Sequence, residues 1–158
     1  MIRTGIGYDC HRFAAGRRLV LGGIELQSDR GLEGHSDADV LTHAVIDALL
    51  GAAALGDIGQ HFPDSDERYR DADSIELLRQ TVEKLGQRGY AIENVDATIV
   101  LELPRVSGAR QEICRSLAQA LGLPTGRVSI KATRGEGMGF VGRGEGAAAI
   151  AVATVTTA

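Results

Sequence analysis

The sequence predicts an α+β protein in which a mixed β-sheet carries its helices on one face. Segments with the two-residue alternation of strands and segments with helical spacing follow one another in the order β-β-α-α-β-α-β-β. No charged, Pro-rich or Ser-rich linker interrupts the 158 residues. The composition, with 44% hydrophobic and 24% charged residues, is typical of a folded globular protein. We therefore expect a single domain over residues 1–158.

Two strands are expected near the N-terminus. Residues 2–13 alternate in character, so Asp9 and His11 fall on the same face of a strand. A short apolar run at residues 19–21 ends at two glycines and is typical of a second strand or of one arm of a hairpin.

Two helices are expected next. Ser36 has the character of an N-cap, and Asp37 and Asp39 would occupy a first turn, where the helix dipole favours carboxylates. Asp73 and Ser74 open a second stretch of helical spacing after a region rich in Gly and Asp. The pattern predicts a helix over 37–54, a mostly irregular loop over 55–73 and a helix over 74–88.

The C-terminal half continues with shorter elements. Pro104 ends an alternating, β-branched stretch, and Gly122 follows a stretch of helical spacing. The pattern predicts a strand over 95–103, a helix over 107–121, a strand over 128–131, a glycine-rich loop over 135–146 and a final strand over 147–155.

Charge and composition limit the partners. Lys and Arg total 17 and Asp and Glu total 21, a net charge of −4 that offers no footprint for nucleic acid or an anionic membrane. Two cysteines and an N-terminus without the apolar core of a signal peptide suggest a reducing compartment, the cytoplasm. With only 4% aromatic residues and 21 glycines, a monomer would gain stability by burying surface against copies of itself.

Three side chains suggest a metal site. Asp9 and His11 offer a carboxylate and an imidazole side by side, which leaves a zinc site short of one further protein ligand. His43 lies mid-helix between Asp39 and Asp47, four residues away on either side, and such carboxylates can fix which ring nitrogen faces a metal. From spacing alone, a helix surface with a satisfied histidine and capping aspartates is the more common arrangement.

Other motifs carry weaker signals. His35 and Ser36 precede the first long helix, where backbone N–H groups could seat a phosphate, although a plain N-cap is far more frequent. Strand alternation points Cys10 away from Asp9, so we expect a buried small hydrophobe. Residues 137–142 match GxGxxG, but no strand-to-helix unit surrounds them, which excludes a dinucleotide fold.

Taken together, these motifs resemble those of the 2-C-methyl-D-erythritol 2,4-cyclodiphosphate synthase family, which acts in the non-mevalonate isoprenoid pathway. The resemblance is colinear over nearly the whole chain, and the combination of DxH, HSDxD and LGDIGxxFPDxD is highly specific. The matching segments are GIGYDCH at 5–11, GHSDAD at 34–39, DALLGAAALGDIG at 47–59, FPDSD at 62–66, KAT at 131–133 and GFVGRGEG at 139–146.

The resemblance implies a homotrimer of ferredoxin-like subunits with an active site at each subunit boundary. Asp9, His11 and His43 would hold Zn²⁺ and leave its fourth position to the substrate. Glu136 would hold a second divalent ion, Mg²⁺ or Mn²⁺, between the phosphates of a substrate that carries a cytidine diphosphate group. Arg134 stands where the family usually has a second hydroxyl residue that contacts phosphate in the transition state.

Substrate contacts follow from the same resemblance. His35 and Arg134 are the candidate catalytic residues, and His35 with Ser36 would seat phosphate. The erythritol group would contact Asp57, Ile58, Gly59, Phe62, Pro63, Asp64, Ser65 and Asp66. The cytidine, held by an adjoining subunit, would contact Leu101, Glu102, Leu103, Pro104, Arg105, Val106, Ser107, Lys131, Ala132 and Thr133. The remaining contacts expected are Asp9, Cys10, His11, Gly135 and Glu136, with Phe140 and Arg143 lining a cavity on the trimer axis that can hold an isoprenoid diphosphate.

The implied reaction needs no side-chain nucleophile. The 2-phosphate of the substrate attacks the β-phosphorus of its own CDP group, a cyclic diphosphate closes, and CMP leaves. This agrees with the absence of a convincing Ser or Cys constellation in the sequence. Two other functions stay open: a zinc phosphohydrolase on the same scaffold, and a non-catalytic sensor that binds an isoprenoid diphosphate through Phe140 and Arg143.

Overall fold

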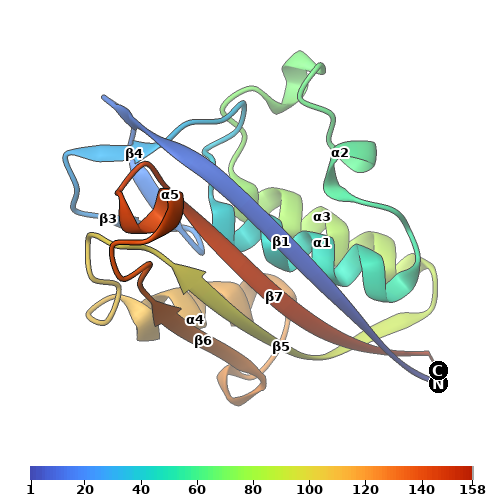
Figure 1. The fold of residues 1–158 in the computed structure, drawn as a ribbon. Helices are drawn as coiled ribbons and strands as arrows, with labels where there is room; N and C mark the ends of the chain where they lie inside the picture. Colours follow the sequence, from blue (N-terminus) through green and yellow to red (C-terminus); the bar gives the residue numbers. More distant parts are fainter. Residues whose placement is uncertain (158) are drawn as a thin grey trace.

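The computed structural model describes residues 1–157 and contains a mixed sheet of five strands in the order β4-β1-β7-β5-β6 (Figure 1). β1 pairs antiparallel with β4 and β7, β7 pairs antiparallel with β5, and β5 and β6 are parallel. The strands span Ile2–Ala15 (β1), Arg30–Leu32 (β4), Tyr90–Val100 (β5), Val128–Thr133 (β6) and Gly146–Thr157 (β7). The predicted α+β class with a mixed sheet is confirmed.

Three helices cover one face of this sheet. In Figure 1 the strands lie in front, and α1, α3 and α4 lie behind them. The helices span Val40–Ala53 (α1), Ser74–Gln87 (α3) and Arg110–Leu121 (α4). α1 packs on β1 and β7, α3 packs beside α1, and α4 packs against α3 and β6. The uncovered face keeps large apolar side chains in solvent, among them Ile6 at 70% and Tyr8 at 54% exposure.

Two glycines let α1 approach β1 closely. A Cβ atom at Gly7 would lie 2.0 Å from the carbonyl oxygen of Ala44, and one at Gly5 would lie 2.1 Å from that of Ala48. β1 therefore packs directly against the backbone of α1. This contact brings Asp9 and His11 on β1 beside His43 on α1.

The first helix begins later than its N-terminal pattern suggests. α1 starts at Val40, and Asp39 is its N-cap, because the Asp39 side chain accepts the Thr42 N–H at 3.0 Å. The expectation that Ser36 caps a helix over 37–54 is therefore wrong. Its hydroxyl instead accepts the Ala38 N–H at 3.3 Å in the preceding loop.

Several other boundaries shift, while the elements themselves are confirmed. The expected strand at 95–103 runs from Tyr90 to Val100, because the five residues before Val95 belong to the strand that pairs with β7. The expected helix at 107–121 begins at Arg110. The short run at 19–21 is confirmed as one arm of a hairpin, β2 (Leu19–Leu21) with β3 (Ile24–Leu26).

The predicted loops contain short helical turns. The additional elements are α2 (Ile58–His61), η1 (Glu67–Tyr69), η2 (Thr125–Arg127) and α5 (Gly139–Gly142). α2 and η1 fall in the stretch expected to be mostly loop, and α5 falls in the glycine-rich stretch. Within residues 1–157, no helix combines the length and the apolar character needed to span a membrane.

Candidate metal centre and substrate pocket

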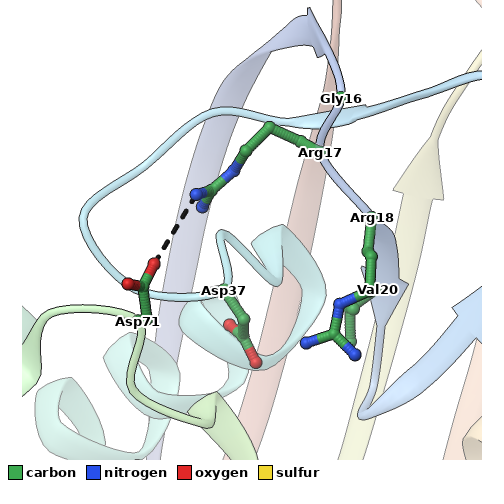
Figure 2. Close-up of a pocket in the computed structure, with 6 residues that line it drawn as sticks. All are labelled: Gly16, Arg17, Arg18, Val20, Asp37 and Asp71. Carbon is green, nitrogen blue, oxygen red and sulfur yellow. Dashed lines mark ion pairs between the residues drawn. The ribbon is translucent and has the colours of Figure 1, made fainter.

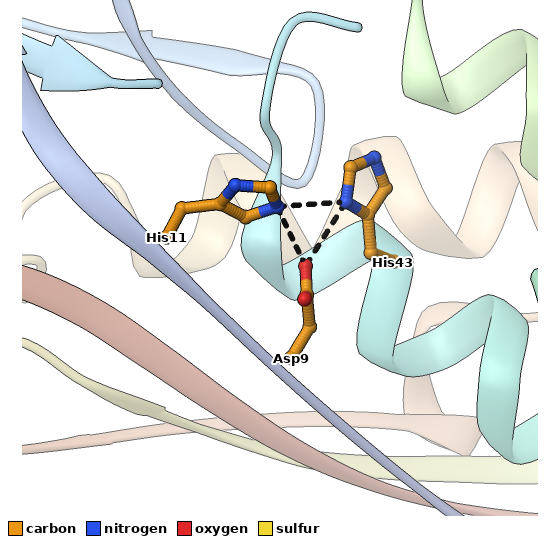
Figure 3. Close-up of side chains that lie close together, drawn as sticks. All are labelled: Asp9, His11 and His43. Atoms are coloured by element: carbon orange, nitrogen blue, oxygen red, sulfur yellow. Dashed lines mark hydrogen bonds and ion pairs between the residues drawn. The ribbon is translucent and has the colours of Figure 1, made fainter. Parts of the chain in front are cut away.

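Asp9, His11 and His43 converge at the contact between β1 and α1 (Figure 3). Asp9 Oδ2 lies 2.9 Å from His11 Nε2 and 3.0 Å from His43 Nδ1. The two ring nitrogens are 3.3 Å apart. Ligand atoms around a tetrahedral zinc ion, with bonds near 2.0–2.1 Å, are about 3.3 Å from one another. The three atoms therefore have nearly the spacing of three ligands around one tetrahedral metal ion.

Hydrogen bonds outside the cluster decide which nitrogens carry protons. His11 Nδ1 lies 2.7 Å from the carbonyl oxygen of Glu33. A carbonyl only accepts, so Nδ1 of a neutral His11 ring carries the proton and Nε2 presents a lone pair to Asp9 and His43. On His43, Nε2 contacts the hydroxyl of Ser74, and Nδ1 faces the cluster. Three groups that can each offer an electron pair thus face one point, which fits a bound cation.

Without a metal, charge holds the same three groups together. Burial opposes ionisation of Asp9, but a proton on a ring nitrogen of His11 or His43 that faces the carboxylate allows a hydrogen bond to it, and these bonds outweigh burial and hold the pKa of Asp9 at about 2. Burial lowers the pKa of His11, yet the hydrogen bond and negative charge of Asp9 raise it above the ordinary value overall. Asp9 is therefore an anion at neutral pH, as a metal-binding carboxylate must be.

The carboxylates expected to orient His43 have other partners. Asp39 accepts the backbone N–H groups of Gly22 and Gly23 and caps α1. Asp47 accepts the Ile58 N–H at 2.8 Å and so anchors α2. The expectation that Asp39 and Asp47 orient His43 is therefore wrong. Spacing of four residues on a helix does not show that backbone N–H groups nearby bind these carboxylates instead.

Serine hydroxyls take the place of those carboxylates. Ser74 Oγ lies 2.8 Å and Ser36 Oγ 3.2 Å from His43 Nε2. Ser74 is fully buried at the start of α3. The sequence pattern marked Ser74 only as a residue that opens a helix, and no spacing rule links it to His43, 31 positions earlier.

A cavity of about 330 Å³ opens over Asp9, His11 and His43, which we call the metal-ligand cluster. It brings together nine residues expected from the resemblance and three others: Gly34, Tyr69 and Leu77. The expected nine are Asp9, His11, His35, Ser36, His43, Ile58, Gly59, Phe62 and Asp64. His35 Nε2 is buried and has no hydrogen-bond partner among the described residues. His35 lines the cavity, and this nitrogen keeps an unused capacity for one hydrogen bond.

Four neighbours expected to contact the erythritol group do not line this cavity. Asp57 caps α2 through the Gln60 N–H at 3.0 Å, and Asp66 caps η1 and pairs with Arg68. Pro63 and Ser65 lie in the same loop, outside the lining. His35 and Ser36 do not stand at the start of the helix as expected, because α1 begins at Val40 and is capped by Asp39, and their contact with phosphate stays a prediction.

A second cavity, of about 210 Å³, lies where β5 and β6 end. It is lined by Leu101, Glu102, Arg105, Val106, Ser107, Ala132, Thr133 and Arg134. Leu103, Pro104 and Lys131 fall outside it. Arg134 Nη2 lies 3.0 Å from Glu102 Oε1, and the other Glu102 oxygen accepts the Gly135 N–H at 2.9 Å. The guanidinium therefore has a carboxylate partner within this chain.

The two cavities lie three strands apart. Asp9 on β1 is in register with Ala149, Ala149 with Ile99, and Ile99 with Ala132 on β6. At about 4.8 Å per strand, roughly 14 Å separates the first of these residues from the last. Ala149 and Ile99 are fully buried between them. Among residues 1–157, none lines both cavities.

The remaining candidate residues lie elsewhere. Glu136 is exposed and lines neither cavity. Phe140 borders a third cavity with Cys10 and Glu145, and Arg143 pairs with Glu145 at 2.7 Å. Cys10 is exposed in this chain, so its expected burial as a small hydrophobe is wrong. By strand alternation it points to the sheet face opposite α1, α3 and α4.

Known proteins match this chain over its length. A family model described as the YgbB family covers residues 2–156. The chain belongs to the YgbB family. It is 57% identical over 157 residues to the 2-C-methyl-D-erythritol 2,4-cyclodiphosphate synthase of Salinibacter ruber. The matched residues cover 99% of this chain and 100% of that protein. The family resemblance expected from the motifs is confirmed.

Solved structures of other proteins have the same fold. The bifunctional IspDF of Campylobacter jejuni superposes with a TM-score of 0.96 at 39% identity and covers all of this chain. This chain spans 43% of that longer protein. A CDP-bound 2C-methyl-D-erythritol-2,4-cyclodiphosphate synthase superposes with a TM-score of 0.90 at 34% identity, over 98% of this chain and 100% of that one.

Proposed function

We propose that this chain converts 4-diphosphocytidyl-2-C-methyl-D-erythritol 2-phosphate into 2-C-methyl-D-erythritol 2,4-cyclodiphosphate and CMP. It would act as a phosphorus–oxygen lyase of isoprenoid biosynthesis, within one synthase domain over residues 1–158. One observation carries the proposal: a carboxylate oxygen and two imidazole nitrogens converge beneath a cavity lined by family motifs, in a chain 57% identical to a synthase that is matched over its whole length. A cytoplasmic location stays a prediction.

The donor set supports a zinc site. Asp9, His11 and His43 would hold Zn²⁺, because two imidazoles and one carboxylate are a common protein ligand set for a catalytic zinc ion with an open position. Exposed Glu136 would hold Mg²⁺ or Mn²⁺, since hard divalent ions prefer carboxylate and phosphate oxygens. When bound, such ions withdraw negative charge from phosphate oxygens.

The chain's own residues would bring the reacting ends of the substrate together. An oxygen of the 2-phosphate attacks the β-phosphorus, and the bond from that phosphorus to the bridging oxygen of the α-phosphate breaks, so CMP leaves with the electron pair. The free Nε2 of His35 and the hydroxyl of Ser36 would contact phosphate in the cavity. Holding both ends in line recovers orientation entropy that is worth about 7–11 kcal/mol in well-aligned intramolecular reactions.

The erythritol group would lie against the loop that contains α2. Ile58, Gly59, Phe62 and Asp64 line the cavity there. Phe62 is only 7% exposed, and it packs edge-on against the ring of Tyr69. This apolar wall would keep water from competing with the 2-phosphate for the β-phosphorus. Asp57, Pro63, Ser65 and Asp66 would contribute through the conformation of the same loop.

Two features favour a trimer with shared active sites. The uncovered sheet face presents Ile6, Tyr8, Ile150 and Val152, each at least 37% exposed, and apolar patches of this kind are typical of protein interfaces. The metal-ligand cavity and the cavity at residues 101–107 and 132–134 also lie apart within one chain. We therefore propose that the adjoining subunit holds the cytidine end of the substrate. Its contacts would lie at residues 101–107 and 131–136. Phe140, Arg143 and Cys10 would then face the trimer axis, where an isoprenoid diphosphate could bind.

A direct assay tests this function. Purified protein with Zn²⁺ and Mg²⁺ is given the CDP-methylerythritol 2-phosphate substrate, and the products are followed by ³¹P NMR. Equal amounts of CMP and a cyclic diphosphate support the proposal. CMP with only the open-chain product supports a zinc phosphohydrolase instead. Tight binding of an isoprenoid diphosphate without any turnover supports a sensor.

A further inference from the structure

The outer side of His43 is held by an unusual pair of residues. Ser74 Oγ lies 2.8 Å from His43 Nε2, and both side chains are buried. Asp37 receives two hydrogen bonds from Ser74, one from the backbone N–H at 3.0 Å and one from the hydroxyl. The carboxylate of Asp37 is therefore linked to the imidazole of His43 through one serine hydroxyl.

The chemistry of the three groups gives this link a direction. A carboxylate only accepts, so the single hydroxyl proton of Ser74 points to Asp37. The lone pairs of that hydroxyl then face His43, and Nε2 must donate to them. If Nε2 were bare instead, either the contact from Ser74 to Asp37 or the contact from Ser74 to His43 would join two lone pairs.

We infer that Asp37 and Ser74 are positioning residues that hold His43 in the tautomer with its proton on Nε2. Nδ1 then keeps the lone pair that faces Asp9 and His11. His11 obtains the same result directly from the Glu33 carbonyl. The inference rests on the metal site of the proposed function and assigns to Asp37 and Ser74 the role of setting its affinity, which outer hydrogen bonds commonly change by 10- to 100-fold.

The far side of Asp37 is also anchored. Asp37, Arg17, Arg18 and Asp71 line a cavity of about 210 Å³. Arg17 pairs with Asp71 across it, at 3.6 Å (Figure 2). Arg17 also donates to the carbonyl of Ser36 at 2.8 Å, and the Asp37 N–H donates to the carbonyl of Ala72 at 3.1 Å. The loop that carries Asp37 is thus tied to the segment before α3, which fixes the carboxylate against Ser74.

Variants of Ser74 and Asp37 test the inference by zinc binding to the full-length, metal-free protein. Ser74→Ala removes the bridging hydroxyl. Asp37→Asn offers an amide group that can donate to the Ser74 hydroxyl, which reverses the direction of that hydrogen bond. We expect each to weaken zinc affinity 10- to 100-fold in competition with a chromophoric chelator, and Ser74→Thr to recover most of the loss. Thr81→Ala is the matched control, because Thr81 is a fully buried hydroxyl on the same helix that bonds only the Leu77 carbonyl.

The tautomer itself can be read without metal. In ¹⁵N NMR of the metal-free protein at pH 8, His43 should show a protonated Nε2 and a bare Nδ1, and Ser74→Ala should shift the ring toward a mixture of tautomers. Zinc affinity within twofold of wild type in both Ser74→Ala and Asp37→Asn, or a protonated Nδ1 in wild type, overturns the inference. If the wild-type protein binds zinc with this dependence but makes no cyclic diphosphate, the proposed function fails and the positioning role stands.

Discussion

The metal-ligand cluster and the cavity at the ends of β5 and β6 are built in opposite ways. In the cluster, side chains with at most 27% exposure point inward, and contacts with Glu33, Ser36 and Ser74 hold the two imidazole rings from outside. In the second cavity, strand ends form the wall. Its main polar contact is the ion pair between Arg134, which is half-exposed, and Glu102, which is less exposed. The first arrangement is complete within one chain, and the second is an open surface.

This difference indicates that the cluster is rigid and that the second cavity can adjust. Buried polar groups must have their hydrogen bonds made, so the cluster has one low-energy arrangement before any ligand arrives. An exposed ion pair contributes about 0–1 kcal/mol and exchanges readily with water or a ligand. We therefore expect changes at the cluster to abolish chemistry and changes at the second cavity to adjust it.

Removal of the metal should have the largest effect. Dialysis against a strong chelator should lower cyclic diphosphate formation by about 10³-fold, equivalent to roughly 4 kcal/mol of transition-state stabilisation. Zn²⁺ should restore the rate in steady-state assays, and Mg²⁺ alone should not. His43→Ala should lose the activity and fail to recover it with Zn²⁺. Full turnover by chelated protein with no bound metal would contradict the metal role of the cluster.

Gly7→Ala should disturb the cluster from a distance. The new Cβ atom would lie 2.0 Å from the carbonyl oxygen of Ala44, so α1 must move away from β1 and carry His43 with it. Overpacking of this kind costs about 1–3 kcal/mol of unfolding free energy, and we expect weaker zinc binding as well. Denaturant unfolding and zinc titration measure the two effects.

A second glycine supplies the control for that experiment. Gly86 is exposed on α3, and nothing lies within 4 Å of the Cβ position. Gly86→Ala should leave zinc affinity unchanged and raise stability by about 0.5–1 kcal/mol, because alanine loses less backbone entropy in a helix. Equal stability changes in Gly7→Ala and Gly86→Ala would show that close packing of β1 on α1 does not shape the site.

Arg134→Ala should have a moderate effect that separates turnover from binding. We expect kcat to fall by about tenfold, or roughly 1.4 kcal/mol, while the Kd for CMP changes less, because the guanidinium can leave Glu102 and stabilise phosphate charge in the transition state. Glu102→Gln, which releases Arg134, tests whether the pair limits the rate. An unchanged kcat in Arg134→Ala would make this side chain a bystander held by Glu102.

Much of the fold follows from local sequence because its signals are local. Alternation marks β1, and helical spacing with Asp73 before it marks α3, whose boundaries are nearly as predicted. The start of α1 is missed because three polar residues, Ser36, Asp37 and Asp39, all suit a cap, and the choice depends on the distant Gly22 and Gly23. Tertiary donors decide which cap forms.

The same limit applies to the candidate site. The pair Asp9 and His11 follows from strand geometry, and His43 joins it only through the resemblance and the structure. Ser74 and Asp37 act across 37 positions, a separation that no periodicity encodes. The predicted burial of Cys10 is wrong for a related reason. Alternation shows which residues share a face of the strand, but it does not show which face the helices cover.

The smallest expected effect is a pH dependence that sharpens the account of the cluster. In the metal-free protein, the pKa of His11 is raised, so its protonated form stabilises the fold below the ordinary value near 6.5, and that contribution is lost as pH rises through the raised pKa. Zinc needs the bare Nε2 and must displace this proton. Asp9, with a pKa of about 2, stays ionised throughout this range.

Zinc should therefore raise the Tm more at pH 8 than at pH 6, because proton competition weakens zinc affinity as the pH falls, by at most about tenfold per pH unit for each proton displaced. Differential scanning fluorimetry with and without Zn²⁺ measures the difference. His61→Gln is the control, since His61 lies outside the cluster and hydrogen-bonds the Leu55 carbonyl, and it should keep the same pH trend. A zinc effect that is constant from pH 6 to 8 would mean that His11 loses no proton on binding, and the raised pKa assigned to its contact with Asp9 would be wrong.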